Sequence, residues 1–147
     1  MAKLAKLQHL SKLNLSHGRF SDKGLASLKS LPRLERLRIV RTPITDAGMA
    51  HLAEIKTLRS VKLDYTKVSD KGIRLLGSLA LEELTLDSTD VGDAGAEALA
   101  AIPTLVSLDL YHTLVSGRGY ERLKSALPNC RIFWEKDSAL PSRRLHL

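Results

Sequence analysis

The sequence of 147 residues is short enough for a single domain, and its 44% hydrophobic and 27% charged residues are typical of a soluble globular protein. This composition excludes collagen-like and disordered chains, and no apolar run approaches the roughly 18 residues that a membrane-spanning helix needs. The formal net charge of +7 leaves anionic partners, nucleic acid among them, to be tested. The only cysteine, Cys130, excludes an internal disulfide and is compatible with a reducing cytoplasm, the location that we predict.

Leucines recur at a nearly fixed interval along the chain. The anchor residues are Leu10, Leu34, Leu58, Leu81 and Leu105, with separations of 24, 24, 23 and 24 residues. A period held over five copies predicts a stack of units that bury their apolar faces against one another. Residues 1–9, with Leu4 and Leu7, match the end of another unit. We therefore expect a partial first repeat whose core layer is incompletely covered.

Each unit begins with a predicted strand. In the second unit Leu37 and Ile39 alternate with Arg36 and Arg38, so that one side of the strand faces the core and the other faces solvent. The other units keep this alternation. We predict one parallel strand per unit and five strands in all.

A short helix is predicted after each strand. A hydroxyl residue followed by aspartate, as in Thr45-Asp46, can cap a helix start while the aspartate lies at its positive end. The corresponding pairs are Ser21-Asp22, Ser69-Asp70 and the weaker Gly92-Asp93. Apolar residues three positions apart should form the buried side of each helix. These are Leu25 and Leu28, Met49 and Leu52, Ile73 and Leu76, Ala96 and Leu99, and Tyr120 and Leu123.

Glycine and threonine also repeat in register. A glycine in a helix costs about 1 kcal/mol relative to alanine, so its regular use predicts a close approach of neighbouring backbones. The glycines are Gly24, Gly48, Gly72, Gly95 and Gly119. The threonine hydroxyls are predicted to satisfy backbone groups in the turns. The threonines are Thr42, Thr66, Thr89 and Thr113.

The unit L-x-x-L-x-L-x-x-T-x-(I/V)-(T/S)-D-x-G resembles the leucine-rich repeat family over about residues 4–137. The segment from Thr42 to Gly48 is similar to the subclass with a short helix per turn, which includes ribonuclease-inhibitor-like and F-box-type cysteine-containing repeats and many bacterial proteins. This resemblance implies an α/β, right-handed solenoid of about five full repeats of 23–24 residues, with a parallel concave sheet and short convex helices. It also implies a non-catalytic module that binds proteins.

The predicted solenoid spans residues 1–137. Its last part, residues 126–137, should be a C-terminal capping turn, because Leu127 to Trp134 imitates a sixth strand with bulkier residues. Residues 138–147 carry no repeat pattern, and we predict a mobile tail there.

The sequence predicts no enzyme, no catalytic residue, no cofactor and no metal site. The five histidines show no metal-ligand spacing, and His17 and His112, which share a register position, lie four turns apart. The repeated aspartates are explained by their places at helix starts. Cys130 takes a leucine position, which predicts a buried apolar thiol.

Charge is distributed unevenly. Residues 1–74 contain 16 Lys and Arg against 6 acids, a charge of +10, whereas residues 75–147 contain 7 against 10, a charge of −3. The predicted solenoid is thus basic at one end of its axis and acidic at the other.

The outward strand positions are the predicted binding surface for an unidentified protein partner. Arginine and tyrosine are frequent among binding hot spots, and several occur at these positions. The predicted partner-binding residues are Lys12, Arg36, Arg38, Arg41, Lys62, Tyr65, Asp87, Asp109 and Tyr111.

Binding of nucleic acid or another anionic surface through the basic half is the alternative function, motivated by a pI near 9.8. Six aromatic residues give no stacking platform, and the acidic half would repel phosphate, so the sequence disfavours nucleic acid. No membrane partner is predicted. Weak self-association is predicted from the uncovered first turn and from the opposite charges of the two halves.

Overall fold

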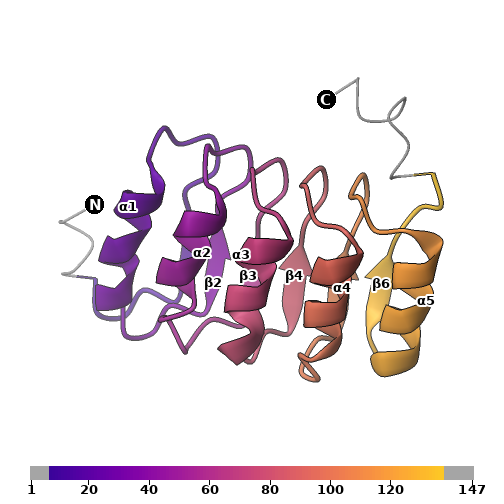
Figure 1. The fold of residues 1–147 in the computed structure, drawn as a ribbon. Coiled ribbons are helices and arrows are strands. Elements are labelled where there is room, and N and C mark those ends of the chain that lie inside the picture. Colours follow the sequence, from indigo (N-terminus) through magenta and orange to yellow (C-terminus); the bar gives the residue numbers. More distant parts are fainter. Residues whose placement is uncertain (1–6, 138–147) are drawn as a thin grey trace.

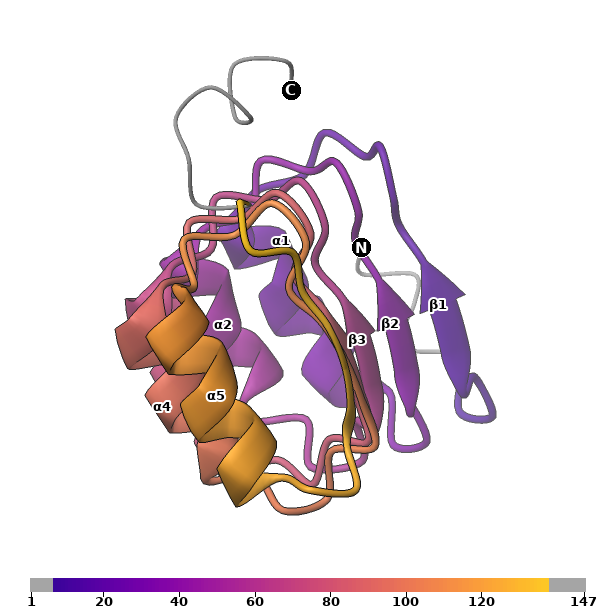
Figure 2. The same cartoon turned by 90° about the vertical axis from the view of Figure 1, so that its right-hand side faces the viewer.

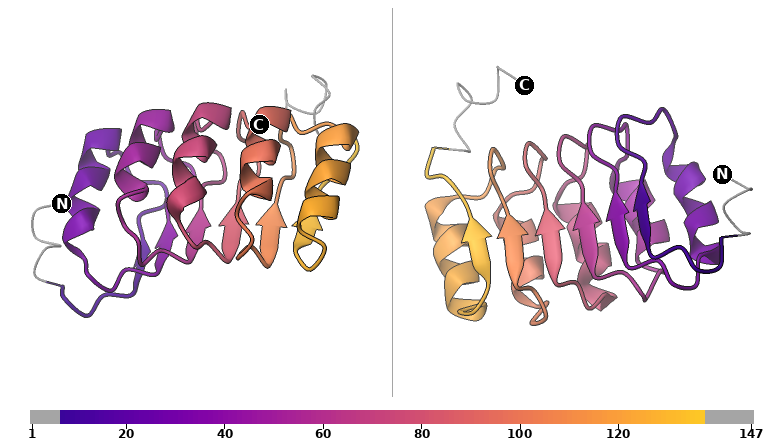
Figure 3. Two further views of the ribbon diagram at one scale, coloured as in Figure 1. Left: turned by 60° about the horizontal axis from the view of Figure 1, so that its bottom comes forward. Right: turned by 180° about the vertical axis from the view of Figure 1, so that it is seen from behind.

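The structure, a computed structural model, describes residues 7–137 as a regular alternation of strands and helices (Figure 1). Six strands lie side by side in a single parallel sheet, in the order in which they occur along the chain (Figure 3). The strands are β1 (Lys12–Asn14), β2 (Arg36–Arg38), β3 (Ser60–Lys62), β4 (Glu83–Thr85), β5 (Ser107–Asp109) and β6 (Arg131–Phe133). The expected capping turn therefore contributes a true sixth strand to the five that were predicted.

Helices cover one side of the sheet, and Figure 2 shows strands and helices as two separate layers. The α-helices are α1 (Asp22–Leu25), α2 (Asp46–Leu52), α3 (Asp70–Leu75), α4 (Asp93–Ala100) and α5 (Gly117–Ala126). Two of them continue into 3₁₀-helices, η2 (Ala26–Ser30) after α1 and η3 (Leu76–Ser78) after α3. One short helix per unit agrees with the prediction.

The core fills the space between the two layers. The inward strand residues stack in register, with Leu37 beside Val61, Val61 beside Leu84 and Leu84 beside Leu108. The predicted inward helix residues are buried, with one exception. Tyr120 is only partly buried and stacks on Trp134, with ring centroids 4.6 Å apart. Tyr120 thus closes the end of the stack instead of filling its interior.

The helix starts follow the predicted capping in part. The side chains of Thr45 and Ser69 accept a hydrogen bond from a backbone N–H in the first turn of their helices, and Ser116, which was not predicted as a cap, does the same for α5. Ser21 makes no such bond, so its predicted capping role is wrong. Gly92 has no side chain to offer, as expected.

The repeated aspartates connect neighbouring units, a role that the sequence reading missed. One carboxylate oxygen of Asp46 accepts the backbone N–H of Ser69 at 2.7 Å, and the other accepts the Ser69 hydroxyl at 2.6 Å. Asp22 holds Thr45 in the same way, and Asp93 holds Ser116. Asp70 accepts the backbone N–H groups of Gly92 and Gly95. Each aspartate therefore braces the start of the next helix.

The brace explains four of the repeated glycines, Gly48, Gly72, Gly95 and Gly119. A Cβ atom at Gly72 would lie 2.5 Å from a carboxylate oxygen of Asp46, and one at Gly48 would lie 2.6 Å from Asp22. The predicted close approach is real, but the nearest atom belongs to an aspartate side chain of the preceding unit and not to its backbone. Glycine leaves the space in which the carboxylate sits.

The threonines behave as predicted. Each hydroxyl donates a hydrogen bond of 2.6–2.7 Å to the backbone carbonyl three residues earlier, and each side chain is buried. These bonds satisfy carbonyl groups where the chain leaves the sheet. The bonds are made within a unit and not between units.

The two ends of the described stack differ. At the start Leu10, Leu13 and Leu15 are only partly buried. At the other end Trp134 packs against the core, and its indole N–H donates to the carbonyl of Val115 at 2.9 Å. Leu4 of the predicted partial repeat and the predicted tail 138–147 lie outside the described residues.

Candidate functional site on the concave sheet face

The concave face is the surface of the sheet that points away from the helices. It carries two rows of side chains, because residues two apart on a strand point the same way and neighbouring strands are in register. The lower row is Lys12, Arg36, Ser60, Glu83, Ser107 and Arg131, and the upper row is Asn14, Arg38, Lys62, Thr85, Asp109 and Phe133. The repeat thus brings residues about 24 positions apart into direct contact across the sheet.

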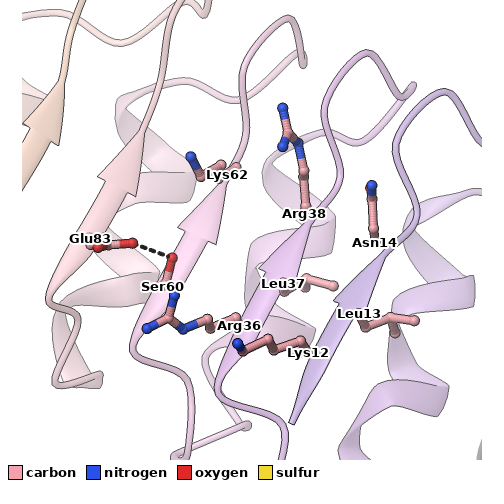
Figure 4. A pocket seen from close by; sticks show the side chains of 9 residues that line it. All are labelled: Lys12, Leu13, Asn14, Arg36, Leu37, Arg38, Ser60, Lys62 and Glu83. Carbon is pink, nitrogen blue, oxygen red and sulfur yellow. Dashed lines mark hydrogen bonds between the residues drawn. The ribbon is translucent and has the colours of Figure 1, made fainter. Parts of the chain in front are cut away.

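A groove of about 410 Å³ lies over β1, β2 and β3 (Figure 4). Four cationic side chains line it: Lys12, Arg36, Arg38 and Lys62. Asn14, Leu13, Leu37, Ser60 and Glu83 complete its wall. We call this the basic groove. All four of its cations were among the predicted binding residues.

The cations of the basic groove are free of partners among residues 7–137, since none of the four makes a hydrogen bond or ion pair there. Some cations elsewhere have partners, although most of those exposed on the helical side have none among the described residues. Lys29 pairs with Glu54 at 2.7 Å, and Arg59 donates to two backbone carbonyls. Four positive charges without ion-pair partners in one groove favour an anionic ligand. The ligand would supply the charge-assisted hydrogen bonds that the four side chains do not make within the described part of the chain.

Glu83 marks the boundary of the basic groove on β4. It accepts a hydrogen bond from the Ser60 hydroxyl at 2.9 Å, as the dashed line in Figure 4 shows. This bond holds the carboxylate against β3, at the edge of the groove. Beyond Glu83 the concave face changes sign.

Arg41 and Tyr65 lie outside the basic groove, at the carboxyl ends of β2 and β3. The guanidinium of Arg41 lies 4.0 Å from the centre of the Tyr65 ring, a cation–π contact. Both residues have positive φ, 53° and 57°. The other strand ends repeat this left-handed conformation at His17, Ser88 and His112, and residues other than glycine seldom adopt it. No residue type in the sequence signals it.

The remaining predicted residues, Asp87, Asp109 and Tyr111, lie over β4 and β5. Asp87 accepts a hydrogen bond from the Ser88 hydroxyl and contacts His112 Nδ1 at 2.8 Å. Asp109 is half-buried and accepts only the backbone N–H of Tyr111 among the described residues. The predicted binding residues therefore form three separate sets: the basic groove, the Arg41–Tyr65 stack and the acidic end.

Burial raises the pKa of Asp109 above its ordinary value, because it penalises the charged form. The backbone N–H of Tyr111 and the imidazole of His112 lower the pKa, whereas the nearby Asp64 and Asp87 carboxylates raise it further. Asp64 is itself occupied, since it accepts the Thr85 hydroxyl and the Asp87 backbone N–H. Asp109 therefore has fewer hydrogen-bond partners than its neighbours Asp64 and Asp87.

Replacing Asp109 with asparagine should increase the free energy of unfolding near neutral pH. The pKa of Asp109 is higher in the folded chain than in the unfolded chain. The wild type therefore loses stability as the pH rises from the ordinary carboxyl pKa through the raised pKa of the folded state. Asparagine keeps an acceptor for Tyr111 and carries no charge, so its advantage should grow from acidic to neutral pH. Urea unfolding at several pH values measures this. An equal gain at every pH, or the same gain in the exposed-residue control Glu97→Gln, would contradict it.

Two exposed rings stand beside Asp109. Tyr111 follows it by two residues, in the turn after β5, and Phe133 is its register partner on β6. Both side chains are 38% exposed. The sequence reading assigned Phe133 only to the cap. Its outward position could have been found from the alternation of Phe133 with the inward Ile132.

The described residues offer little catalytic chemistry. The Ser88 hydroxyl donates to Asp87 and not to the imidazole of His112, so these three residues do not form a nucleophile–base pair. No group of three or more His, Cys, Asp or Glu residues within 7–137 could hold a metal ion. Cys130 is only partly buried, not fully as predicted, and burial raises the pKa of its thiol. None of the helices in this range has the length and apolarity to cross a membrane.

Comparison with known proteins agrees with this architecture. Residues 6–29 and 80–100 match the family model described as Leucine Rich repeat. An internalin C2 (inlC2) of Listeria monocytogenes superimposes with a TM-score of 0.68 at 22% identity, over 97% of this chain and 62% of its own. An internalin (inlF) of the same organism gives a TM-score of 0.61 at 19% identity, over 97% and 48%. The chain has the leucine-rich-repeat fold.

The leucine-rich-repeat solenoid spans about half to two thirds of the length of these internalins. A comparison with curated protein sequences gives no significant match. At these identities the likeness establishes the fold, and the findings together support a leucine-rich-repeat family. Folds of this type serve generally as protein interaction modules, in which the sheet presents an extended binding surface.

Proposed function

We propose that this chain is a non-catalytic protein-binding module whose basic groove holds an acidic segment of a partner protein. The observation that carries the proposal is the set of four unpartnered cations in one hollow, Lys12, Arg36, Arg38 and Lys62. Lysine and arginine rarely converge without counter-charges, because their mutual repulsion costs free energy. An acidic side chain in the groove would accept charge-assisted hydrogen bonds from them.

The fold supports this role. Parallel strands built on a repeated, braced unit hold the four cations at fixed spacings, so that little ordering is needed when a partner binds. We also infer that the repeats belong to the subclass with a short helix per turn, which the five α-helices of four to ten residues support.

Nucleic acid binding is the second candidate function. The pI near 9.8 and the basic groove favour it. The groove, however, extends over only three strands, about 10 Å at the usual strand spacing. A longer polyanion would continue over Glu83, Asp87 and Asp109, where repulsion opposes it. An acidic protein segment can change its charge along its length, and we therefore favour it.

The triple variant Arg36→Ala, Arg38→Ala, Arg41→Ala should lose binding of the partner by at least about tenfold, because three cations of the concave face and its rim are removed. Affinity capture with the wild-type and variant chains, followed by titration of the proteins that differ, measures this. The matched control is Arg118→Ala, Arg122→Ala, Lys124→Ala on α5, which removes the same charge from exposed residues of the helical side.

An unchanged set of captured proteins for the concave-face variant would reject the proposal. Capture of nucleic acid that is lost at high salt would favour the second candidate, since phosphate contacts depend steeply on salt. Size exclusion with light scattering at low and high salt precedes the capture. It tests the predicted self-association, whose electrostatic form must weaken as salt rises because surface charges are screened over about 8 Å at physiological salt.

A further inference from the structure

A surface of different chemistry lies on the concave face beyond Glu83. Asp109 is the last residue of β5, with Phe133 as its register partner on β6 and Tyr111 two residues further along the chain, and both rings are exposed. We call these three residues the aromatic–carboxylate subsite.

The carboxylate of this subsite makes no ion pair among the described residues, although the imidazole of His112 lies near enough to oppose part of the rise in the carboxylate's pKa. The carboxylate oxygens of Asp64 and Asp87 already have polar partners. These are Thr85, Ser88, His112 and a backbone N–H. Asp109 has only the N–H of Tyr111 among the described residues, although it is half-buried. Its negative charge is therefore available to a ligand, which would offset the cost of burial.

A guanidinium or ammonium group fits these three residues. It can pair with the carboxylate while its flat or alkyl surface lies on the rings, and each ring adds a cation–π attraction. We infer that the aromatic–carboxylate subsite binds an arginine or lysine side chain of the same segment whose acidic residues occupy the basic groove. The inference rests on the proposed function and adds the order of charges in the partner.

The geometry sets the spacing of those charges. From β2, which carries Arg36 and Arg38, to β5, which carries Asp109, there are three strand spacings, about 14 Å. An extended polypeptide covers that distance in about four residues. The partner segment therefore carries acidic side chains and, about four residues away, a basic one. A polyphosphate cannot supply the second charge.

Arg131 limits the subsite from below. It is exposed at the end of the lower row on β6, two residues before Phe133. Its charge opposes a cation in the lower row, so the ligand side chain must lie in the upper row beside Asp109. Removing Arg131 should leave the preference for a basic side chain intact or increase it.

Fluorescence anisotropy with labelled peptides tests the inference on the full chain. One peptide has a run of glutamates, a Gly-Ser spacer and an arginine about four residues on. The matched peptide has glutamine in place of arginine, and both are also made in reverse order. We expect the arginine peptide to bind about threefold to tenfold more tightly in at least one order. Asp109→Asn and Phe133→Leu should each reduce this ratio toward one, whereas Glu97→Gln on α4 should leave it unchanged.

The outcomes separate the two proposals. Binding of the glutamine peptide that is weakened by Arg36→Ala, Arg38→Ala, with no gain from arginine, keeps the proposed function and overturns the inference. A gain that survives Asp109→Asn also overturns the inference. Failure of every peptide to bind overturns both proposals. Binding that is equally tight to the wild type and to the Arg36→Ala, Arg38→Ala variant also overturns both. Tighter binding of a single-stranded oligonucleotide than of any peptide, reduced by the groove variant, assigns the groove to nucleic acid and overturns both.

Discussion

Replacing Gly72 with alanine should reduce the free energy of unfolding by about 2–3 kcal/mol, because the new methyl group has no room. Its Cβ would lie 2.5 Å from a carboxylate oxygen of Asp46, 2.9 Å from Met49 Cγ and 3.1 Å from Val68 Cγ1. The carboxylate cannot retreat without breaking its two bonds to Ser69. Urea unfolding followed by circular dichroism measures the change.

Gly77→Ala is the matched control for this prediction. No heavy atom lies within 4 Å of a Cβ at Gly77, which is in η3. Alanine there should be neutral or stabilising by up to about 1 kcal/mol, because it restricts the unfolded chain. Equal effects of the two substitutions would show that the Asp46 brace does not restrict residue 72.

A double-mutant cycle isolates the carboxylate. Asp46→Ala should itself cost about 1–3 kcal/mol, since it leaves the Ser69 N–H and hydroxyl without their acceptors. In that background Gly72→Ala should cost less than in the wild type, because its nearest obstacle is gone. If the free-energy changes of the two substitutions were strictly additive, the steric clash of the new methyl group at residue 72 would be with Met49 and Val68 and not with Asp46.

Trp134→Ala should lower the free energy of unfolding by about 2–3 kcal/mol. A fully buried tryptophan replaced by alanine costs about 3–5 kcal/mol, and Trp134 is only partly buried. The substitution removes the stack on Tyr120 and the bond to the Val115 carbonyl, so the last core layer is opened to water. Denaturation followed by circular dichroism gives the value, since Trp134 is the only tryptophan.

Two variants refine the result. Trp134→Phe retains a ring for Tyr120 and loses the indole N–H, so it should cost about 1 kcal/mol. Phe133→Leu, one residue away on the exposed side of β6, should change stability by less than about 0.5 kcal/mol. If Trp134→Ala were as mild as Phe133→Leu, the C-terminal turn would not act as a cap.

The repeat itself could be predicted from local patterns. The leucine period fixes where each strand lies, and the alternation around Leu37 and Val61 fixes which side is buried, because a strand reverses its side chains at every residue. The same two facts place Lys12, Arg36, Arg38 and Lys62 outward and close together. Most of the basic groove therefore follows from the sequence.

The contacts between units could not be predicted. Asp46 is the first residue of α2, so local reasoning assigns it to that helix, yet it binds Ser69, 23 residues further on. Whether a carboxylate turns toward its own helix or toward the next one depends on the distance between units, which no residue encodes alone. The Arg41–Tyr65 stack and the left-handed strand ends have the same origin.

The sequence by itself determined the solenoid, its inward leucines and its change of charge along the axis, because periodicity and composition are local properties that any compact arrangement must satisfy. The tertiary structure alone decided which charges are compensated. Asp64 and Asp87 form hydrogen bonds or close polar contacts with neighbouring residues. Asp109 accepts one hydrogen bond, and the cations of the basic groove have no partner among the described residues. Compensation depends on angstrom-scale distances between residues of different units, and those distances exist only once the units have stacked.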